Sequence, residues 1–277
     1  MKIIRYEDRH GNIGYAAQDE SGAPNVIEGS IFGTYRVTDD KADVHRLLAP
    51  VVPSTIWGIG LNYRRHAEES GMAVPTAPVV FAKGLNTIQD PGEPIIIPEC
   101  CSREEVDYEC ELVVVIGRTC KNVSKADALN YVLGYTCGND VSARDWQLKR
   151  GGSQWCRGKS FDTFAPIGHC LVTADAIPNP NSLSISTLLN GRPMQQWNTD
   201  DMIFGVPEIV SFLSQSTTLL PGTLIFTGTP HGIGMAQKPP RWLRDGDEVS
   251  IVIEKIGTLT NPVINESHAL HTAGAAD

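Results

Sequence analysis

Short apolar runs separated by glycine and proline dominate the chain from residue 55 onward. Their length and their content of β-branched residues predict strands rather than helices. The clearest of these runs cover residues 56–59, 79–81, 95–97, 112–116, 224–226 and 249–253. Asn190-Gly191 lies between two further strand-like runs and predicts a tight hairpin turn.

The first fifty residues show the same strand-like character in a more polar setting. Runs at residues 3–6 and 13–17 flank a turn at residues 10–12. A short helix is predicted over residues 41–48, ending before Pro53. Residues 1–50 are therefore interpreted as a small N-terminal β-rich module.

Helical patterns are few in the rest of the chain. Ser124 begins a capping-box pattern that predicts a helix through Val132, and residues 206–214 have an amphipathic pattern. From residue 264 no apolar period continues, so residues 264–277 are expected to form a loose C-terminal tail. The pattern predicts a β-rich α+β domain over residues 51–263.

Composition and charge exclude several classes of protein. The 277 residues are 41% hydrophobic and 20% charged, as in globular proteins, and the net charge of −9 argues against a nucleic-acid partner. The N-terminus lacks the apolar core of a signal peptide, and no run approaches the roughly 18 apolar residues of a membrane span. The seven cysteines include no Cys-x-x-Cys pair, which favours reduced thiols in a cytoplasmic protein.

Two carboxylates in an apolar setting are the most informative feature. Glu109 and Glu111 lie two residues apart in the strand-like segment 108–117, so they share one face and precede an unbroken apolar run. Burying both costs several kcal/mol per ion unless a cation compensates. Asp140 ends another strand-like run, and three carboxylates suit a hard cation such as Mg²⁺, Mn²⁺ or Ca²⁺. The alternative is an edge strand with both glutamates in water.

Six segments, in order, resemble motifs of the fumarylacetoacetate hydrolase family. They are residues 60–69 (GLNYRRHAEE), 78–83 (PVVFAK), 106–112 (VDYECEL), 139–147 (NDVSARDWQ), 158–164 (GKSFDTF) and 227–234 (TGTPHGIG). The resemblance covers about three-quarters of the chain. It implies a mixed β-sandwich roll of the fumarylacetoacetase C-terminal type.

Residues 238–247 further resemble the branch that includes bacterial homologues and the mitochondrial domain-containing proteins of the family. That branch includes acylpyruvases, oxaloacetate decarboxylases, oxaloacetate tautomerases and diketo-acid hydrolases. The chain departs from the motifs at Leu61, where an arginine is usual, and at His169, where a proline is usual. Leu61 puts in doubt a carboxylate clamp by that side chain.

The resemblance implies a metal site formed by Glu109, Glu111 and Asp140. It would hold Mg²⁺ or Mn²⁺, with Ca²⁺ as a substitute in crystals, and stabilise an enolate. His66 and Glu69 are expected to form a water-activating pair on a lid, because residues three apart share a helix face. Pairing of His66 with Glu68 is the alternative.

Further residues receive roles from the same resemblance. Lys159 is expected to stabilise an enolate or oxyanion, and Gln147 to orient water or a carbonyl. The Thr229 hydroxyl and neighbouring N–H groups are candidates for holding a substrate carboxylate. Arg144 either binds that carboxylate or forms a salt bridge with Asp145 or another acid. Tyr63 is a weaker pocket candidate, and Lys83 is expected to pair with the metal carboxylates.

Three functions remain open from the sequence. The leading hypothesis is metal-dependent hydrolysis of a C–C bond in an acylpyruvate-like or 2,4-diketo acid. The alternative is an oxaloacetate decarboxylase or keto–enol tautomerase that uses the same metal site, and the third is a non-catalytic metal-binding protein. The partners expected are a small dicarbonyl acid and a second copy in a homodimer, without nucleic acid or membrane.

Overall fold

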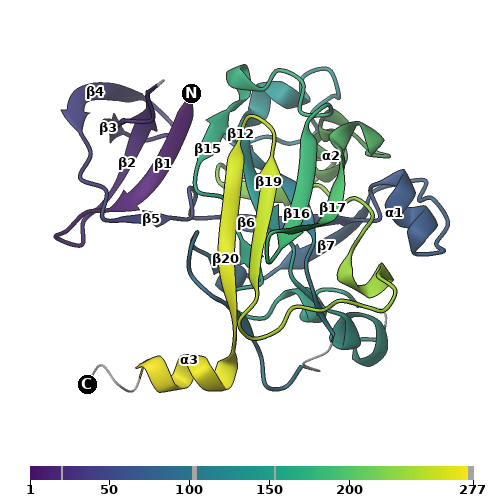
Figure 1. Ribbon diagram of the computed structural model, residues 1–277. Coiled ribbons are helices and arrows are strands. Elements are labelled where there is room, and N and C mark those ends of the chain that lie inside the picture. The colour runs from purple at the N-terminus through teal and green to yellow at the C-terminus, as the bar shows by residue number, and fades with distance from the viewer. Residues whose placement is uncertain (20, 102–104, 153, 274–277) are drawn as a thin grey trace.

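The computed structural model describes residues 1–19, 21–101, 105–152 and 154–273 (Figure 1). Within these ranges the strands form one sheet of eleven strands, one of five and two pairs. Helices are short and lie around the edges of the sheets. The β-rich α+β prediction is confirmed.

The large sheet runs through the whole molecule and includes the N-terminal module. In spatial order its strands are β4 (Tyr35–Lys41), β3 (Pro24–Gly29), β2 (Ile13–Gln18), β1 (Lys2–Glu7), β15 (Leu171–Thr173), β12 (Val132–Asn139), β11 (Cys110–Ile116), β18 (Thr223–Phe226), β6 (Thr55–Gly60) and β7 (Val79–Lys83), with β5 (Arg46–Leu48) beside β1. Adjacent strands are antiparallel except β18 and β6, which are parallel. Within this sheet, strand β1 of the module pairs with β15 through two residue pairs, Lys2 with Val172 and Ile3 with Leu171.

The second sheet packs in front of the central strands of the large one (Figure 1). It consists of β17 (Arg192–Asn198), β16 (Ser184–Leu189), β19 (Glu248–Ile253), β20 (Gly257–Asn265) and β9 (Ile95–Ile97). The short pairs are β10 (Val106–Asp107) with β13 (Ser142–Ala143), and β8 (Ile88–Gln89) with β14 (Ala165–Pro166).

Strand β11 lies at the centre of the core and is buried on both faces. Leu112 and Val114 belong to a cluster that includes Ile251 of the second sheet. Val113 packs in a different cluster, with Phe226. This burial explains the unbroken apolar run, because both faces of the strand contact other side chains. The residues at the start of β11 therefore lie in a buried part of the molecule.

The described helices are short. They are α1 (Arg64–Glu69), α2 (Val206–Leu213), α3 (Glu266–Ala273), the π-helix η3 (Asp145–Arg150), and the 3₁₀ turns η1 (Leu85–Thr87), η2 (Ala128–Tyr131), η4 (Arg157–Lys159), η5 (Ala174–Ala176), η6 (Thr199–Asp201) and η7 (Gly234–Ala236). The amphipathic prediction for α2 is confirmed, since Val206, Ile209, Val210 and Leu213 are buried.

The hairpin prediction at Asn190-Gly191 is also confirmed. These residues connect β16 to β17, with φ angles of 52° and 74°. Positive φ at both central positions matches the twist of the flanking strands, and asparagine and glycine tolerate it.

Two helix predictions are wrong. Residues 41–48 contain the end of β4 and the whole of β5, because Arg46 pairs in register with Glu7 of β1 and also forms an ion pair with it. Ser124 does contact Asp127 as a capping box would, but only the 3₁₀ turn η2 follows. Pairing of Val132 with β11 ends that helical turn.

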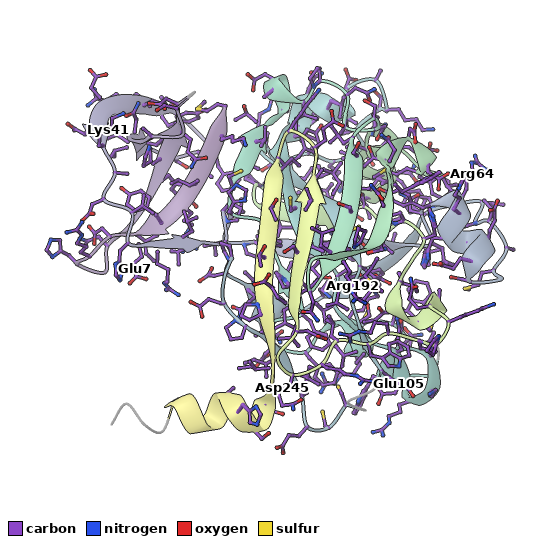
Figure 2. All side chains as sticks on the ribbon, viewed as in Figure 1. Glu7, Lys41, Arg64, Glu105, Arg192 and Asp245 are labelled. Carbon is purple, nitrogen blue, oxygen red and sulfur yellow. The ribbon has the colours of Figure 1, made fainter. Side chains whose placement is uncertain are left out.

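The prediction of a loose tail from residue 264 is also wrong for the residues that the structure describes. Strand β20 continues to Asn265 and α3 follows it at once. Asp245 secures this junction by accepting hydrogen bonds from the Asn265 N–H and the His268 imidazole, and Figure 2 shows it at the start of α3. Polar contacts hold the segment, so an apolar period was not required. Residues 274–277 lie outside the described residues.

Candidate active site

A cavity of about 180 Å³ lies where β6 and β12 end and β11 begins. Its polar lining residues include Glu109, Glu111, Asp140, Arg144, Gln147, Lys159, His66 and Thr229. Its apolar lining residues include Ile59, Leu61, Met72, Phe81, Leu148, Trp155, Ile233 and Met235. A small ligand in this cavity would therefore meet both charged groups and hydrocarbon.

The pairing of β11 with β12 brings three carboxylates together. In this antiparallel pair Cys110 is opposite Asn139, so Glu109 and Glu111 lie beside the end of β12, where Asp140 follows. All three side chains are buried, and their ligand oxygens lie within 4.8 Å of one another. The sequence placed these residues in one cluster, and the structure brings them together.

Two lysines neutralise part of this cluster. Lys159 Nζ donates to Glu109 Oε2 at 2.8 Å, to Asp140 Oδ2 at 2.5 Å and to Ser142 Oγ at 2.7 Å. Lys83 Nζ donates to Asp140 Oδ1 at 2.6 Å, which agrees with its expected pairing. Burial disfavours ionised Glu109, but the charges of Lys159 and Arg144 outweigh it and hold the pKa of Glu109 well below its usual range.

Glu111 has different partners from those of Glu109 and Asp140. Among the described residues it forms no ion pair with lysine or arginine, and Oε2 accepts the Gly228 N–H at 2.7 Å. Burial, followed by repulsion from Asp140 and Glu109, raises the pKa of Glu111 well above its ordinary value. Glu111 is therefore the carboxylate of the cluster without an ion-pair partner among the described residues. A divalent cation with oxygen ligands fits this donor set, because it would supply positive charge to Glu111.

The buried Lys83–Asp140 pair leads to a stability prediction. Replacing Lys83 by methionine is expected to lower the free energy of unfolding by about 3 kcal/mol, because Asp140 loses one of its two buried counter-charges. Urea denaturation in EDTA measures this loss. Lys149→Met is the matched control, because its ion pair with Glu105 is exposed and should contribute less than about 1 kcal/mol. Equal losses in the two variants would contradict the assignment.

Arg144 forms buried ion pairs with two acids, Asp107 and Glu109. Its Nε and one Nη donate to Asp107 Oδ2 at 3.0 and 2.8 Å, and the same Nη donates to Glu109 at 2.7 Å. Its other Nη donates to Gln147 Oε1 at 2.9 Å. Since a guanidinium group only donates, the Gln147 oxygen must face it, which directs the amide NH₂ of Gln147 elsewhere. Gln147 lines the cavity and is thus suited to donate to a ligand.

His66 and Glu69 meet on helix α1, at the edge of the molecule in Figure 1. His66 Nδ1 lies 3.3 Å from Glu69 Oε1, and His66 is buried at the cavity. Glu69 also accepts the Gly232 N–H at 2.9 Å, which fixes its carboxylate. The structure pairs His66 with Glu69, so the alternative with Glu68 is not the observed one.

Thr229 and Tyr63 have different positions. Thr229 lines the cavity, and its Oγ1 accepts a hydrogen bond from Gln195. Tyr63 is fully buried in the core cluster and is not among the residues that line the cavity, so its role as a pocket residue stays a prediction. It precedes α1, and its backbone pairs with Met202.

The two departures from the family motifs, Leu61 and His169, differ in their position relative to the cavity. Leu61 lines the cavity with a φ of 51°, a backbone conformation uncommon for leucine, so an apolar side chain is held at the ligand site. His169 lies outside the cavity lining, close to Gly257.

Sequence reasoning missed two buried residues that organise the site. Asp107 accepts hydrogen bonds from Arg144 and from the Gly234 and Met235 N–H groups. The spacing of Asp107, Glu109 and Glu111 by two residues was a usable signal, because such positions share a face. Gln195 had no comparable signal, since its partners are distant in sequence.

A family model for the fumarylacetoacetate (FAA) hydrolase C-terminal domain matches residues 55–264. The chain belongs to the fumarylacetoacetate hydrolase family. A fumarylacetoacetate hydrolase domain-containing protein 2 homologue from Dictyostelium discoideum is 51% identical over 227 residues, covering 79% of this chain and 74% of the relative. A mitochondrial oxaloacetate tautomerase from Xenopus laevis is 45% identical over 219 residues, covering 79% and 68%.

Solved structures of the same family confirm the predicted fold. A crystal structure of 2-hydroxyhepta-2,4-diene-1,7-dioate isomerase from Mycobacterium marinum has 41% sequence identity and a TM-score of 0.82. The match covers 96% of this chain and 99% of the isomerase. As a member of the fumarylacetoacetate hydrolase family, this chain has the fold of an enzyme family. The described residues contain no helix long and apolar enough to cross a membrane, and the cytoplasmic location and homodimer stay predictions.

Proposed function

We propose that this protein is a divalent-metal-dependent tautomerase that interconverts the keto and enol forms of a 2-oxo dicarboxylic acid such as oxaloacetate. The observation that carries the proposal is one cavity lined both by His66, which is paired with Glu69, and by a three-carboxylate cluster. The naming of the Xenopus relative as an oxaloacetate tautomerase supports the choice of substrate.

Glu109, Glu111 and Asp140 would hold Mg²⁺ or Mn²⁺ in this proposal. The bound ion would supply positive charge against a developing enolate. Lys159 already donates to Glu109, Asp140 and Ser142, which accounts for its three N–H groups. We therefore assign Lys159 to positioning the carboxylates, in place of the direct enolate contact expected from the sequence.

His66 is the proton-transfer group. Its Nδ1 faces Glu69, so the carboxylate stabilises the tautomer with the proton on Nδ1 and leaves the Nε2 lone pair for the substrate. Nε2 takes a proton from the carbon beside the keto carbonyl, a C=C bond forms, and the carbonyl π electrons move to oxygen. Transfer of that same proton from Nε2 to the oxygen completes the enol and regenerates neutral His66, and the reverse steps restore the ketone.

Gln147 and Thr229 would bind the polar end of the substrate. The amide NH₂ of Gln147 is directed away from Arg144, and the Thr229 hydroxyl retains a proton to donate. Arg144 donates to Asp107, Glu109 and Gln147, so its proposed role is to orient Gln147 rather than to bind a substrate carboxylate.

Hydrolysis of an acylpyruvate remains the second candidate. The same His66–Glu69 pair would activate water, and the apolar residues of the cavity lining favour a substrate with a hydrocarbon substituent. Leu61 is one of these residues, and a cationic side chain at its position would instead favour a second carboxylate.

Product identification separates the two candidates. The protein should accelerate decay of enol-oxaloacetate to the ketone without releasing pyruvate, and should leave acylpyruvates intact. EDTA should abolish the acceleration, and Mn²⁺ should restore it. Equimolar pyruvate and carboxylic acid from an acylpyruvate would instead establish hydrolysis, and pyruvate with CO₂ from oxaloacetate would establish decarboxylation.

A further inference from the structure

Gln195 links the two main sheets directly beside the candidate metal ligands. It lies on β17 of the second sheet and is 1% exposed, whereas its neighbour Gln196 is exposed. Its Oε1 accepts the Cys110 N–H at 3.0 Å and the Thr187 hydroxyl at 2.7 Å. Its Nε2 donates to Thr229 Oγ1 at 2.7 Å and to the Pro230 carbonyl at 2.8 Å. Both ends of the amide are therefore fully used.

The orientation of this amide is fixed by its partners. The Cys110 N–H can only donate, so it must face the amide oxygen of Gln195. The Pro230 carbonyl can only accept, so it must face the amide NH₂. These two contacts independently place the NH₂ group against Thr229 Oγ1.

This orientation determines what the Thr229 hydroxyl can do. Because Gln195 donates to it, one lone pair of Oγ1 is occupied and the hydroxyl proton remains available. Thr229 lines the cavity. The substrate proposed above carries carboxylate and keto oxygens, which are strong acceptors for this proton. The Cys110 thiol, a weak acceptor, also lies beside this hydroxyl and competes only modestly for the proton.

We propose that Gln195 is a positioning residue that makes Thr229 a hydrogen-bond donor to a substrate oxygen. The inference rests on the proposed function, since it assumes an oxyanionic substrate in the cavity. It assigns Gln195 a role in substrate affinity. Loss of a hydrogen bond to a charged group should weaken binding about 10- to 100-fold.

Gln195→Glu is the informative substitution, because it keeps the shape and replaces the donor by an acceptor. One carboxylate oxygen still receives the Cys110 N–H, while the other draws the Thr229 proton away from the cavity. Thr229→Val removes the hydroxyl itself, and Thr229→Ser retains it. Gln196→Glu makes the same change at the adjacent exposed position of β17 and serves as the matched control.

The readouts are KM and kcat for oxaloacetate, the Kd for oxalate in Mn²⁺-loaded protein, and the Mn²⁺ affinity. Gln195→Glu and Thr229→Val should each raise KM and the oxalate Kd about 10- to 100-fold, with kcat within about threefold. The double variant should be no worse than either single variant, because both remove one hydrogen bond. Gln196→Glu should resemble wild type, and Thr229→Ser, which keeps the hydroxyl, should recover most of the affinity that Thr229→Val loses.

Three results would overturn the inference. Multiplying effects in the double variant would show that the residues act independently. Weakened Mn²⁺ binding with a fall in kcat would show that Gln195 only maintains the strand beside the metal ligands. Should Gln195→Glu not fold, an unchanged oxalate Kd in Thr229→Val would suffice to reject it. Because oxalate binding needs no turnover, an inactive wild type would refute the proposed function and leave this test valid.

Discussion

Replacing Glu111 by glutamine is expected to lower kcat/KM for oxaloacetate tautomerisation by at least about 1000-fold and to leave the protein folded. The variant removes the one carboxylate of the cluster that no described lysine or arginine neutralises. In the proposed site it removes a metal ligand, so Mn²⁺ affinity should fall about 100-fold or more. The rate of enol decay measures kcat/KM, and calorimetric titration with Mn²⁺ measures the metal affinity.

The direction in which Glu111→Gln changes the stability of the metal-free protein can also be predicted. The pKa of Glu111 is raised in the folded protein by burial and by the neighbouring carboxylates. A carboxyl group whose folded pKa exceeds its unfolded value destabilises the protein once the pH rises above the unfolded value. A neutral glutamine avoids this cost. In EDTA at neutral pH, the melting temperature of Glu111→Gln should therefore equal or exceed that of wild type.

Metal should reverse that order of stability. Mn²⁺ should stabilise wild type and have little effect on the variant, because only a bound ligand raises the free energy of unfolding. Glu248→Gln, at an exposed position of β19, is the control and should match wild type throughout. Retained Mn²⁺ affinity in Glu111→Gln would show that the cluster is not the metal site.

The second large effect is expected from His66→Ala. Loss of the proton-transfer group should reduce kcat/KM for tautomerisation about 100- to 10,000-fold, the usual contribution of a positioned acid–base group. Mn²⁺ affinity should stay within about threefold, because His66 is not among the three carboxylate ligands. Enol decay and Mn²⁺ titration on the same sample separate the two effects.

Glu69→Gln tests the pairing within the dyad. It should lower activity about tenfold, because an amide keeps most of the contact with Nδ1 but not the negative charge that faces the imidazolium formed on proton transfer. Glu68→Gln, one residue earlier on α1, should leave activity unchanged and is the matched control. Equal activity of His66→Ala and wild type would show that His66 is not the base.

Local rules indicated the paired glutamates of the three-carboxylate cluster but left an exposed edge strand as an alternative, and the family resemblance supplied the full set. Residues two apart share a face of a strand, and an unbroken apolar run indicates burial on both faces. Glu109 and Glu111 therefore stood out beside residues 112–116. The addition of Asp140 needed only the pairing of β11 with β12, and the observed register supplies it.

Residues whose roles depend on distant partners could not be assigned in the same way. Arg144 was expected to contact Asp145 as one option, but its partners Asp107 and Glu109 lie more than thirty positions away in sequence. Tyr63 belongs to a matched motif, yet the bridge to Met202 places it in the core. No local pattern reports such tertiary contacts.

Errors in secondary structure have the same origin. Residues 41–48 have a local pattern compatible with a helix, but β1 offers a free edge that pairs with Arg46–Leu48. At the C-terminus, Asp245 secures the start of α3 without any apolar period. In both places, contacts distant in sequence determine the structure and local preference does not.

The most direct test of the account follows the ultraviolet absorbance of enol-oxaloacetate in wild type before EDTA, after EDTA and after Mn²⁺ is returned. A parallel sample is assayed for pyruvate, and buffer with the same Mn²⁺ supplies the uncatalysed rate. We expect enol decay well above that rate, loss of the excess in EDTA, full recovery with Mn²⁺, and no pyruvate beyond the amount formed in that buffer. Enol decay at the buffer rate, or an excess that EDTA leaves unchanged, would contradict it.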